Sequence, residues 1–127
     1  YPENGQDIET LIHRADLAMY RAKTSGRGRF SFFSNEMNLV AQERLKLETT
    51  LREALKVQGL HLHYQPQVDL KSGQVYGVEA LARWTDPQFG EISPTRFIPL
   101  AEECGLIGEL GLWALSESCR QLSEWRR

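Results

Sequence analysis

The sequence predicts an α/β fold in which a β-hairpin is flanked by helices. Apolar and polar residues alternate along residues 60–68, and a second extended run follows at 75–84. Between the two runs, Lys71-Ser72-Gly73 is a turn signal, so the strands are expected to pair in antiparallel fashion. Before and after this pair, apolar residues recur at spacings of three and four residues, which predicts helices.

The composition is that of an ordinary globular protein. The 127 residues are 41% hydrophobic and 25% charged, and the formal net charge of −2 gives no global attraction to a nucleic-acid polymer or an anionic membrane. No apolar run reaches transmembrane length, because Glu109 interrupts the best candidate near 106–115, and no signal peptide is visible. Cys104 and Cys119 lack metal-type spacing, so they are expected to be free thiols in a reducing compartment, which predicts a cytoplasmic location.

The first expected element is a helix that Asp7 caps and Gly26 ends. One of its faces carries apolar residues at helical spacing, namely Ile8, Leu11, Ile12, Ala15, Met19 and Ala22. Its C-terminal end carries cations with no acid between them, namely Arg21, Lys23, Arg27 and Arg29. The cation cluster is either a solvated helix end or a phosphate-binding group, and the pattern leaves both open. A short strand is expected at Phe30–Phe33.

A second helix is expected to run from Ser34 or Asn35 to Gly59. Its acids and bases are mixed, as on a solvated helix with one buried stripe. Because its interior contains neither Pro nor Gly, we predict a stiff linker, with a domain boundary near 34–42. The expected division is therefore residues 1–34, a linker at 35–59 and a second domain at 60–127.

The candidate site lies on the second strand of the pair. Because side chains alternate between the faces of a strand, Glu79, Leu81 and Arg83 share one face, and small apolar residues share the other. A carboxylate can hold a divalent metal ion, and a guanidinium can fork onto phosphate oxygens. The alternative is an ordinary strand end with opposite charges four residues apart, and this segment alone favours that simpler interpretation.

The first strand of the pair carries two histidines, His61 and His63, which can in principle chelate a metal ion. No third ligand accompanies them, so we expect them to be solvent-facing. After the pair, residues 85–91 are expected to form a loop.

Two more helices are expected to follow this loop. Ser93 caps the first, which opens on Pro94 and stops at Gly105, and the second spans about 107–125. Glu102 and Glu103 on the first of these helices are either site acids or, as is commoner, surface carboxylates.

Three motifs follow one another in the second part of the chain. They are Tyr64-Gln65-Pro66, then Gly77-Val78-Glu79-Ala80-Leu81-Ala82-Arg83-Trp84, then Ile92-Ser93-Pro94-Thr95-Arg96-Phe97-Ile98-Pro99-Leu100-Ala101-Glu102-Glu103-Cys104-Gly105-Leu106-Ile107. In this order they resemble the opening third of an EAL domain, the family of the cyclic-di-GMP phosphodiesterases. The resemblance covers about Gln42 to Arg127, and three ordered motifs make it specific.

The first 34 residues resemble a different family. Tyr1-Pro2-Glu3-Asn4-Gly5, then Ala15-Asp16-Leu17-Ala18-Met19-Tyr20-Arg21-Ala22-Lys23, then Gly26-Arg27 are similar to the tail of a GGDEF domain, the diguanylate cyclase family. Gly28 stands where that family usually has Asn, and its signature loop is absent from this chain. The resemblance implies that Lys23 and Arg27 approach nucleotide phosphates.

The resemblance to the EAL family implies an incomplete TIM-type (β/α) barrel with one antiparallel strand, preceded by the helical GGDEF remnant and the linker helix. It implies that Glu79 ligates Mg²⁺ or Mn²⁺ and acts in catalysis through that metal. It also implies that Gln65, Leu81 and Arg83 contact cyclic-di-GMP, Arg83 through phosphate. The implied reaction is metal-dependent hydrolysis of cyclic-di-GMP to the linear dinucleotide.

The chain is expected to be a piece of a longer protein, because a (β/α)₈ barrel takes about 250 residues and the family's remaining metal ligands and catalytic Lys lie further along. It opens on Tyr1-Pro2 and stops on Arg126-Arg127 at the end of a helical pattern. We therefore expect the junction of two enzymes, inactive by itself. A non-catalytic cyclic-di-GMP receptor and a structural coupling module stay open as alternatives, as does a homodimer of the parent protein.

Overall fold

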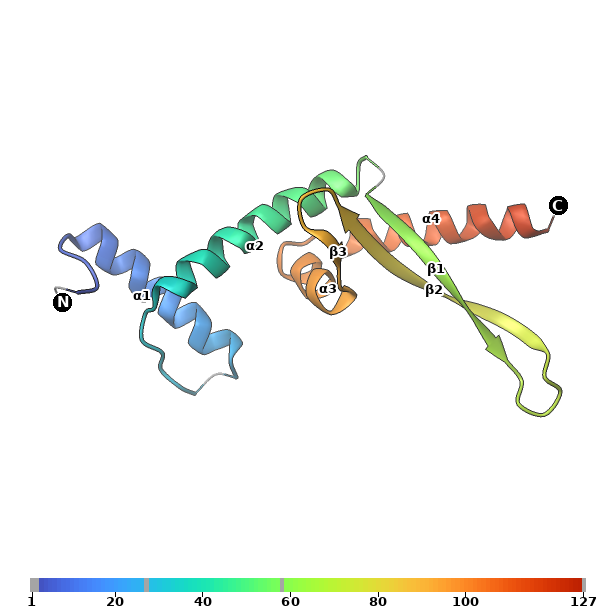
Figure 1. The fold of residues 1–127 in the computed structure, drawn as a ribbon, viewed down its shortest axis with the longest axis horizontal. Coiled ribbons are helices and arrows are strands. Elements are labelled where there is room, and N and C mark those ends of the chain that lie inside the picture. Colours follow the sequence, from blue (N-terminus) through green and yellow to red (C-terminus); the bar gives the residue numbers. More distant parts are fainter. Residues whose placement is uncertain (1–2, 27, 58, 127) are drawn as a thin grey trace. The chain divides into compact units, whose positions relative to one another are not determined.

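The computed structural model describes residues 3–26, 28–57 and 59–126 (Figure 1). The described residues form four helices and one three-stranded antiparallel sheet with the strand order β1-β2-β3. In chain order the elements are α1 (Ile8–Thr24), α2 (Asn35–Ala54), β1 (Leu60–Val68), β2 (Val75–Asp86), β3 (Gly90–Ile92), α3 (Pro94–Glu103) and α4 (Ile107–Trp125). Contacts divide the chain into two compact units, Tyr1–Leu47 and Glu48–Arg127. None of the helices described is both long and apolar enough to cross a membrane.

In the first unit, α1 begins as predicted. The side chain of Asp7 accepts hydrogen bonds from the backbone N–H of Thr10 at 2.8 Å and from its hydroxyl at 2.7 Å. These bonds hold the pKa of Asp7 below its usual value, and the negative charge also suits the N-terminal end of the helix dipole. At the other end, Gly26 adopts a φ of 113°, a conformation that residues with a Cβ rarely adopt, so the predicted stop signal is confirmed.

The predicted strand at Phe30–Phe33 is wrong. The described residues 28–33 contain no strand, and the sheet formed by the described residues consists of β1, β2 and β3 without them. A strand needs a ladder of backbone partners. Instead the side chains associate locally. Phe30 and Phe32 are about four-fifths exposed and meet edge to face with their centroids 5.5 Å apart, and the guanidinium of Arg14 lies 4.8 Å from the Phe33 ring centroid.

Helix α2 starts at Asn35, as predicted, and ends at Ala54 rather than at Gly59. Two N–H groups just after it, those of Lys56 and Val57, both bond to the carbonyl of Glu53 and tighten the end of the helix. Gly59 lies so close to the helix end that a Cβ there would stand 2.8 Å from the Ala54 Cβ. The division between the two units falls inside α2, within the segment predicted as a linker.

In the second unit, β1 and β2 form the predicted antiparallel hairpin, the long twisted ribbon of Figure 1. In the turn, the side chain of Asp69 accepts hydrogen bonds from backbone N–H groups that have no backbone carbonyl to bond with among the described residues. Its Oδ1 accepts from the N–H groups of Lys71 at 2.8 Å and Ser72 at 2.7 Å. Gly73 has a φ of 69°, as a tight turn requires. One irregularity, a bulge between Gln67 and Val68, separates this turn from the regular part of the ladder.

The prediction of a loop over 85–91 is partly wrong. Strand β2 continues to Asp86, and β3 returns beside it with Thr85 opposite Glu91. Asp86 Oδ1 accepts from the N–H groups of Gln88 at 2.8 Å and Phe89 at 2.9 Å, so three residues suffice to reverse the chain. The pairing adds a third strand where the Gly and Pro signals indicated only a loop.

Helices α3 and α4 pack against the hairpin. Helix α3 begins as predicted, with Ser93 accepting from the N–H of Thr95 at 3.3 Å, and it brings Phe97 edge to face against Trp84 with ring centroids 5.9 Å apart. Both of these rings are fully buried. Helix α4 contacts both long strands, and its Trp125 meets the Tyr64 ring at 4.9 Å. One face of the hairpin therefore contributes Leu60 and Trp84 to the core, whereas Val78 and Ala80 further along the same face are exposed.

Candidate functional site

The candidate site lies on the hairpin face that α3 and α4 do not cover. Directly opposite residues of an antiparallel pair share a face, with their Cβ atoms roughly 5 Å apart. The register places three such pairs on this face, namely His61 with Arg83, His63 with Leu81, and Gln65 with Glu79. We call these six residues the open face. The structure thus brings the three predicted residues of β2 together with Gln65 of β1.

Glu79 is exposed on the open face, and among the described residues its carboxylate has no hydrogen bond or ion pair. Gln65 stands directly across from it and adds an amide oxygen. Both are hard oxygen donors of the kind that Mg²⁺ and Mn²⁺ take, and Mg²⁺ typically uses only one or two carboxylates with water and substrate phosphate as its other ligands. In chemical type the donors fit such an ion. In number they do not complete a site, since no three His, Cys, Asp or Glu side chains group together within the described ranges.

Arg83 is half-buried, and one of its guanidinium nitrogens donates to the carbonyl of Ala82 at 2.9 Å. This bond anchors one side of the fork and leaves N–H groups for another acceptor. Four residues of strand separate Arg83 from Glu79 by about 13 Å, and no ion pair joins them. The opposite charges therefore do not neutralise each other, and both groups remain available to a ligand.

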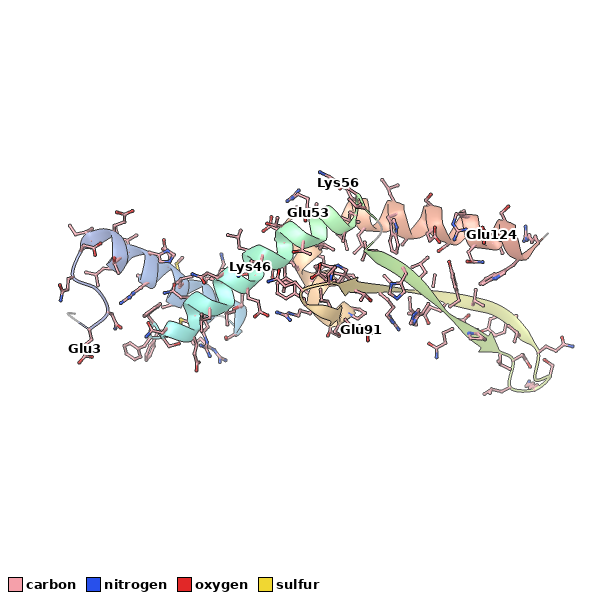
Figure 2. The ribbon with its side chains drawn as sticks, turned by 45° about the horizontal axis from the view of Figure 1, so that its top comes forward. Glu3, Lys46, Glu53, Lys56, Glu91 and Glu124 are labelled. Carbon is pink, nitrogen blue, oxygen red and sulfur yellow. The ribbon has the colours of Figure 1, made fainter. Side chains whose placement is uncertain are left out.

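Sequence reasoning missed Glu91. Strand β3 places it opposite Thr85, so that it lies on the same side of the sheet as Arg83. Figure 2 labels Glu91. It is exposed and diagonal to Arg83, a spacing of roughly 7–8 Å. It is also about 20 Å along the sheet from Glu79, too far for the two carboxylates to share one ion. The alternation of Gly90-Glu91-Ile92 after a turn was the only signal for this short strand.

Lys23 lies in the other unit, in the last turn of α1. It borders an open cavity of about 580 Å³ whose lining is mostly apolar, with Ala18 and Ala22 as its buried floor and Arg29 as a second cation. Arg27 falls outside the described residues, so the structure gives no outcome for its predicted phosphate contact.

The two other carboxylates predicted as possible site acids are placed away from the open face. Glu102 and Glu103 are exposed at the end of α3. Cys104 and Cys119 are free thiols, as expected. Tyr64 lies on the covered face, where burial, aided by the charge of Glu117, raises its pKa, so the phenol is neutral at physiological pH and does not act as a base.

The fold is that of part of an EAL domain. The family model of that name matches residues 48–127, and the chain belongs to this family. It is 50% identical over 125 residues to the "Bifunctional diguanylate cyclase/cyclic di-GMP phosphodiesterase MucR" of Pseudomonas aeruginosa, covering 98% of this chain and 18% of that protein. It is 47% identical over 125 residues to the "Cyclic di-GMP phosphodiesterase PdeR" of Escherichia coli, covering 98% of this chain and 19% of that protein.

A solved structure is similar to part of the chain. The "PaMucR Phosphodiesterase, c-di-GMP complex" superimposes with a TM-score of 0.59 at 51% identity, over 63% of this chain and 32% of that one. The chain thus spans less than a fifth of the length of the two curated relatives and about a third of the solved chain.

Proposed function

We propose that this chain is part of a protein that hydrolyses cyclic-di-GMP to the linear dinucleotide with the help of a divalent metal ion. The observation that carries the proposal is the open face, where Glu79, Leu81 and Arg83 line up beside Gln65, with Glu79 and Gln65 exposed and Leu81 and Arg83 half-buried. Two relatives are named as cyclic-di-GMP phosphodiesterases. A solved phosphodiesterase in complex with c-di-GMP is also similar to this chain over about a third of its own length. Both similarities support the choice of substrate.

Each residue has a role that follows from its chemistry. Glu79 would hold Mg²⁺ or Mn²⁺, which when bound supplies Lewis acidity and an activated water. Arg83, fixed at the Ala82 carbonyl, presents its remaining N–H groups to a phosphate. Leu81 offers an apolar contact between these two charges, and Gln65 offers a hydrogen-bonding amide. The chain by itself is inactive in this proposal, because one carboxylate does not complete the metal site.

We further propose that the domain order of the parent protein is cyclase-like, then phosphodiesterase. Residues 1–34 would be the tail of a GGDEF domain, 35–59 a linker helix, and 60–127 the start of a TIM-type barrel. The relative named as bifunctional supports this order, because its match covers 98% of this chain and so extends into the first unit. In this arrangement Lys23 and Arg27 are the cyclase-side phosphate contacts, and the location is cytoplasmic.

The test is hydrolysis of cyclic-di-GMP by the full-length protein at saturating Mg²⁺ or Mn²⁺. Glu79→Gln keeps the size of the side chain and removes its charge, and it is expected to lower the rate on the order of 100-fold or more through lost metal catalysis. Glu102→Gln, at an exposed position of α3, is the matched control and should retain the parental rate. Hydrolysis by Glu79→Gln at the parental rate would contradict the metal assignment, and binding without hydrolysis by the unmodified protein would identify a receptor.

A further inference from the structure

His61 and His63 belong to the open face, yet the proposed function gives them no role. Both side chains are exposed, and their rings lie 5.1 Å apart with planes tilted by 56°. Within the described parts of the chain, this ring contact is their only recorded interaction. Each imidazole therefore keeps its ring nitrogens free for a ligand.

The register places His61 directly across from Arg83. Their Cβ atoms are roughly 5 Å apart, so the imidazole and the guanidinium flank the same volume above the two strands. The bond from Arg83 to the Ala82 carbonyl draws one side of the guanidinium toward the edge of β2 that faces away from β1, because the N–H of Thr85 bonds to Gly59 and backbone groups alternate in direction along a strand. The N–H groups on the other side of the guanidinium are left for an acceptor above the His61–Arg83 pair, which an N–H donor from His61 can approach from the opposite strand.

The charges around this pair favour an anion. On this side of the described sheet, Glu91 is diagonal to Arg83 and one strand further from His61, while Glu79 lies four residues from Arg83 along β2. A metal ion on the two histidines would stand beside the positive charge of Arg83, which is unfavourable. It would also lack a third protein ligand, since the described residues contain no group of three.

We propose that His61 is a second phosphate-binding residue, which donates an imidazole N–H to the phosphate that Arg83 holds, and that His63 positions the His61 ring through their contact. This rests on the proposed function, because the phosphate is one of the two phosphodiesters of cyclic-di-GMP. His61 and Arg83 then donate hydrogen bonds to the same phosphate from opposite strands. The oxygens of a phosphate are arranged tetrahedrally, whereas those of a carboxylate lie in one plane, so a carboxylate would not accept from both residues in the same way.

The experiment is calorimetric binding of cyclic-di-GMP to the full-length protein in EDTA, where hydrolysis and the metal are both removed from the measurement. His61→Ala is expected to raise Kd at least about tenfold, the effect of one charge-assisted hydrogen bond. His61→Gln keeps an N–H donor and should recover part of this loss, whereas His61→Phe keeps only the ring and should not. His13→Ala, at an exposed histidine of α1, is the matched control and should leave Kd unchanged.

The two roles are separated at His63. His63→Phe preserves the ring contact and should leave Kd within about twofold, whereas His63→Ala should weaken binding by a few fold because the His61 ring loses its neighbour. An unchanged Kd in His61→Ala, with the unmodified protein binding normally, overturns the inference alone. A failure of the unmodified protein to bind overturns the proposed function and the inference with it. A His63→Phe loss as large as that of His61→Ala overturns the positioning role.

Discussion

The two faces of the β1–β2 hairpin differ in what their side chains contact, although the same two strands supply both. On the covered face, Leu60 and Trp84 are paired across the strands, and both are buried against the rest of the unit. On the open face, the next pair along is His61, which is exposed, and Arg83, which is half-buried. Neighbours in sequence therefore have separate tasks, with Trp84 serving stability and Arg83 remaining available for binding.

This separation follows from the two-residue period of a strand. It predicts that substitutions on the covered face change the free energy of unfolding, whereas substitutions on the open face change affinity and rate. The faces are independent only as long as the register holds, because a slip of one residue would exchange them.

The largest effect is expected from Trp84→Ala. The indole is fully buried and packs edge to face on Phe97, so its removal leaves a cavity in the core. We expect a loss of about 3–5 kcal/mol in the free energy of unfolding. Denaturant unfolding of the full-length protein, followed by a probe in this domain, measures it. Leu81→Ala on the open face is the matched control, and an equal loss from both would show that the two faces are not distinct in energy.

A smaller loss of stability is expected from Gly59→Ala. The added Cβ would lie 2.8 Å from the Ala54 Cβ and 3.3 Å from its Cα, so the backbone at the end of α2 has to shift. We expect a cost of about 1–3 kcal/mol, as for overpacking in a core.

Gly111→Ala is the control for Gly59→Ala. Nothing lies within 4 Å of a Cβ at that position of α4, and the change should instead stabilise the helix by up to about 1 kcal/mol. If Gly59→Ala is as stable as the parent in the same denaturant experiment, the close approach of Gly59 to Ala54 at the end of α2 does not limit the residue at position 59.

The sequence predicted the elements that have strong local signals. Strand β1 has the predicted bounds because its alternation is regular and a turn follows it, and α3 starts where the Ser93-Pro94 cap indicated. Strand β3 was missed because three residues are too few for a period to register. Phe30–Phe33 was overpredicted because aromatic residues favour strands only when a neighbouring strand is present.

For the candidate site, alternation alone placed Glu79, Leu81 and Arg83 on one face. It could not tell which residues of β1 stand opposite them, because the register depends on the length of the turn and on the bulge at Gln67/Val68, which has no signature in the sequence. The position of the histidines across from Leu81 and Arg83 therefore came only from the structure.

On the open face, Arg83→Ala is expected to weaken cyclic-di-GMP binding about tenfold, since it removes a forked, charge-assisted contact. Leu81→Ala should be milder, because only an apolar contact is lost. Arg83→Lys separates charge from geometry: it keeps the charge and loses the fork, so we expect an intermediate Kd.

Calorimetry measures the Kd of all three variants, and unfolding free energies equal to that of the parent would confirm that this face contributes little to stability. A parental Kd for Arg83→Ala would remove Arg83 from the proposed site.

The smallest effect concerns the turn that sets the register of both faces. Hydrogen bonds from Ser72, chiefly its backbone N–H, and then from the N–H of Lys71 hold the pKa of Asp69 below its ordinary value of 3.8. Because the folded pKa is lowered, the carboxylate stabilises the turn at pH above the ordinary value, and this contribution is lost as the pH falls through the folded pKa. The stability difference between the parent and Asp69→Ala should therefore be present at pH 7 and shrink below about pH 4.

Asp69→Asn is the variant that makes this last test specific to charge. Its amide oxygen can still accept from the N–H groups of Lys71 and Ser72, but it does not titrate over this range, so its stability relative to Asp69→Ala should not depend on pH. Asp7, in the other unit, also has a lowered pKa, so its titration changes the free energy of unfolding with pH as well. Because Asp7 is present in every variant, this contribution cancels when the free energies of two variants are subtracted. If the difference between the parent and Asp69→Ala is the same at pH 3 and pH 7, the turn is held by its backbone alone, and the register that separates the two faces does not depend on this carboxylate.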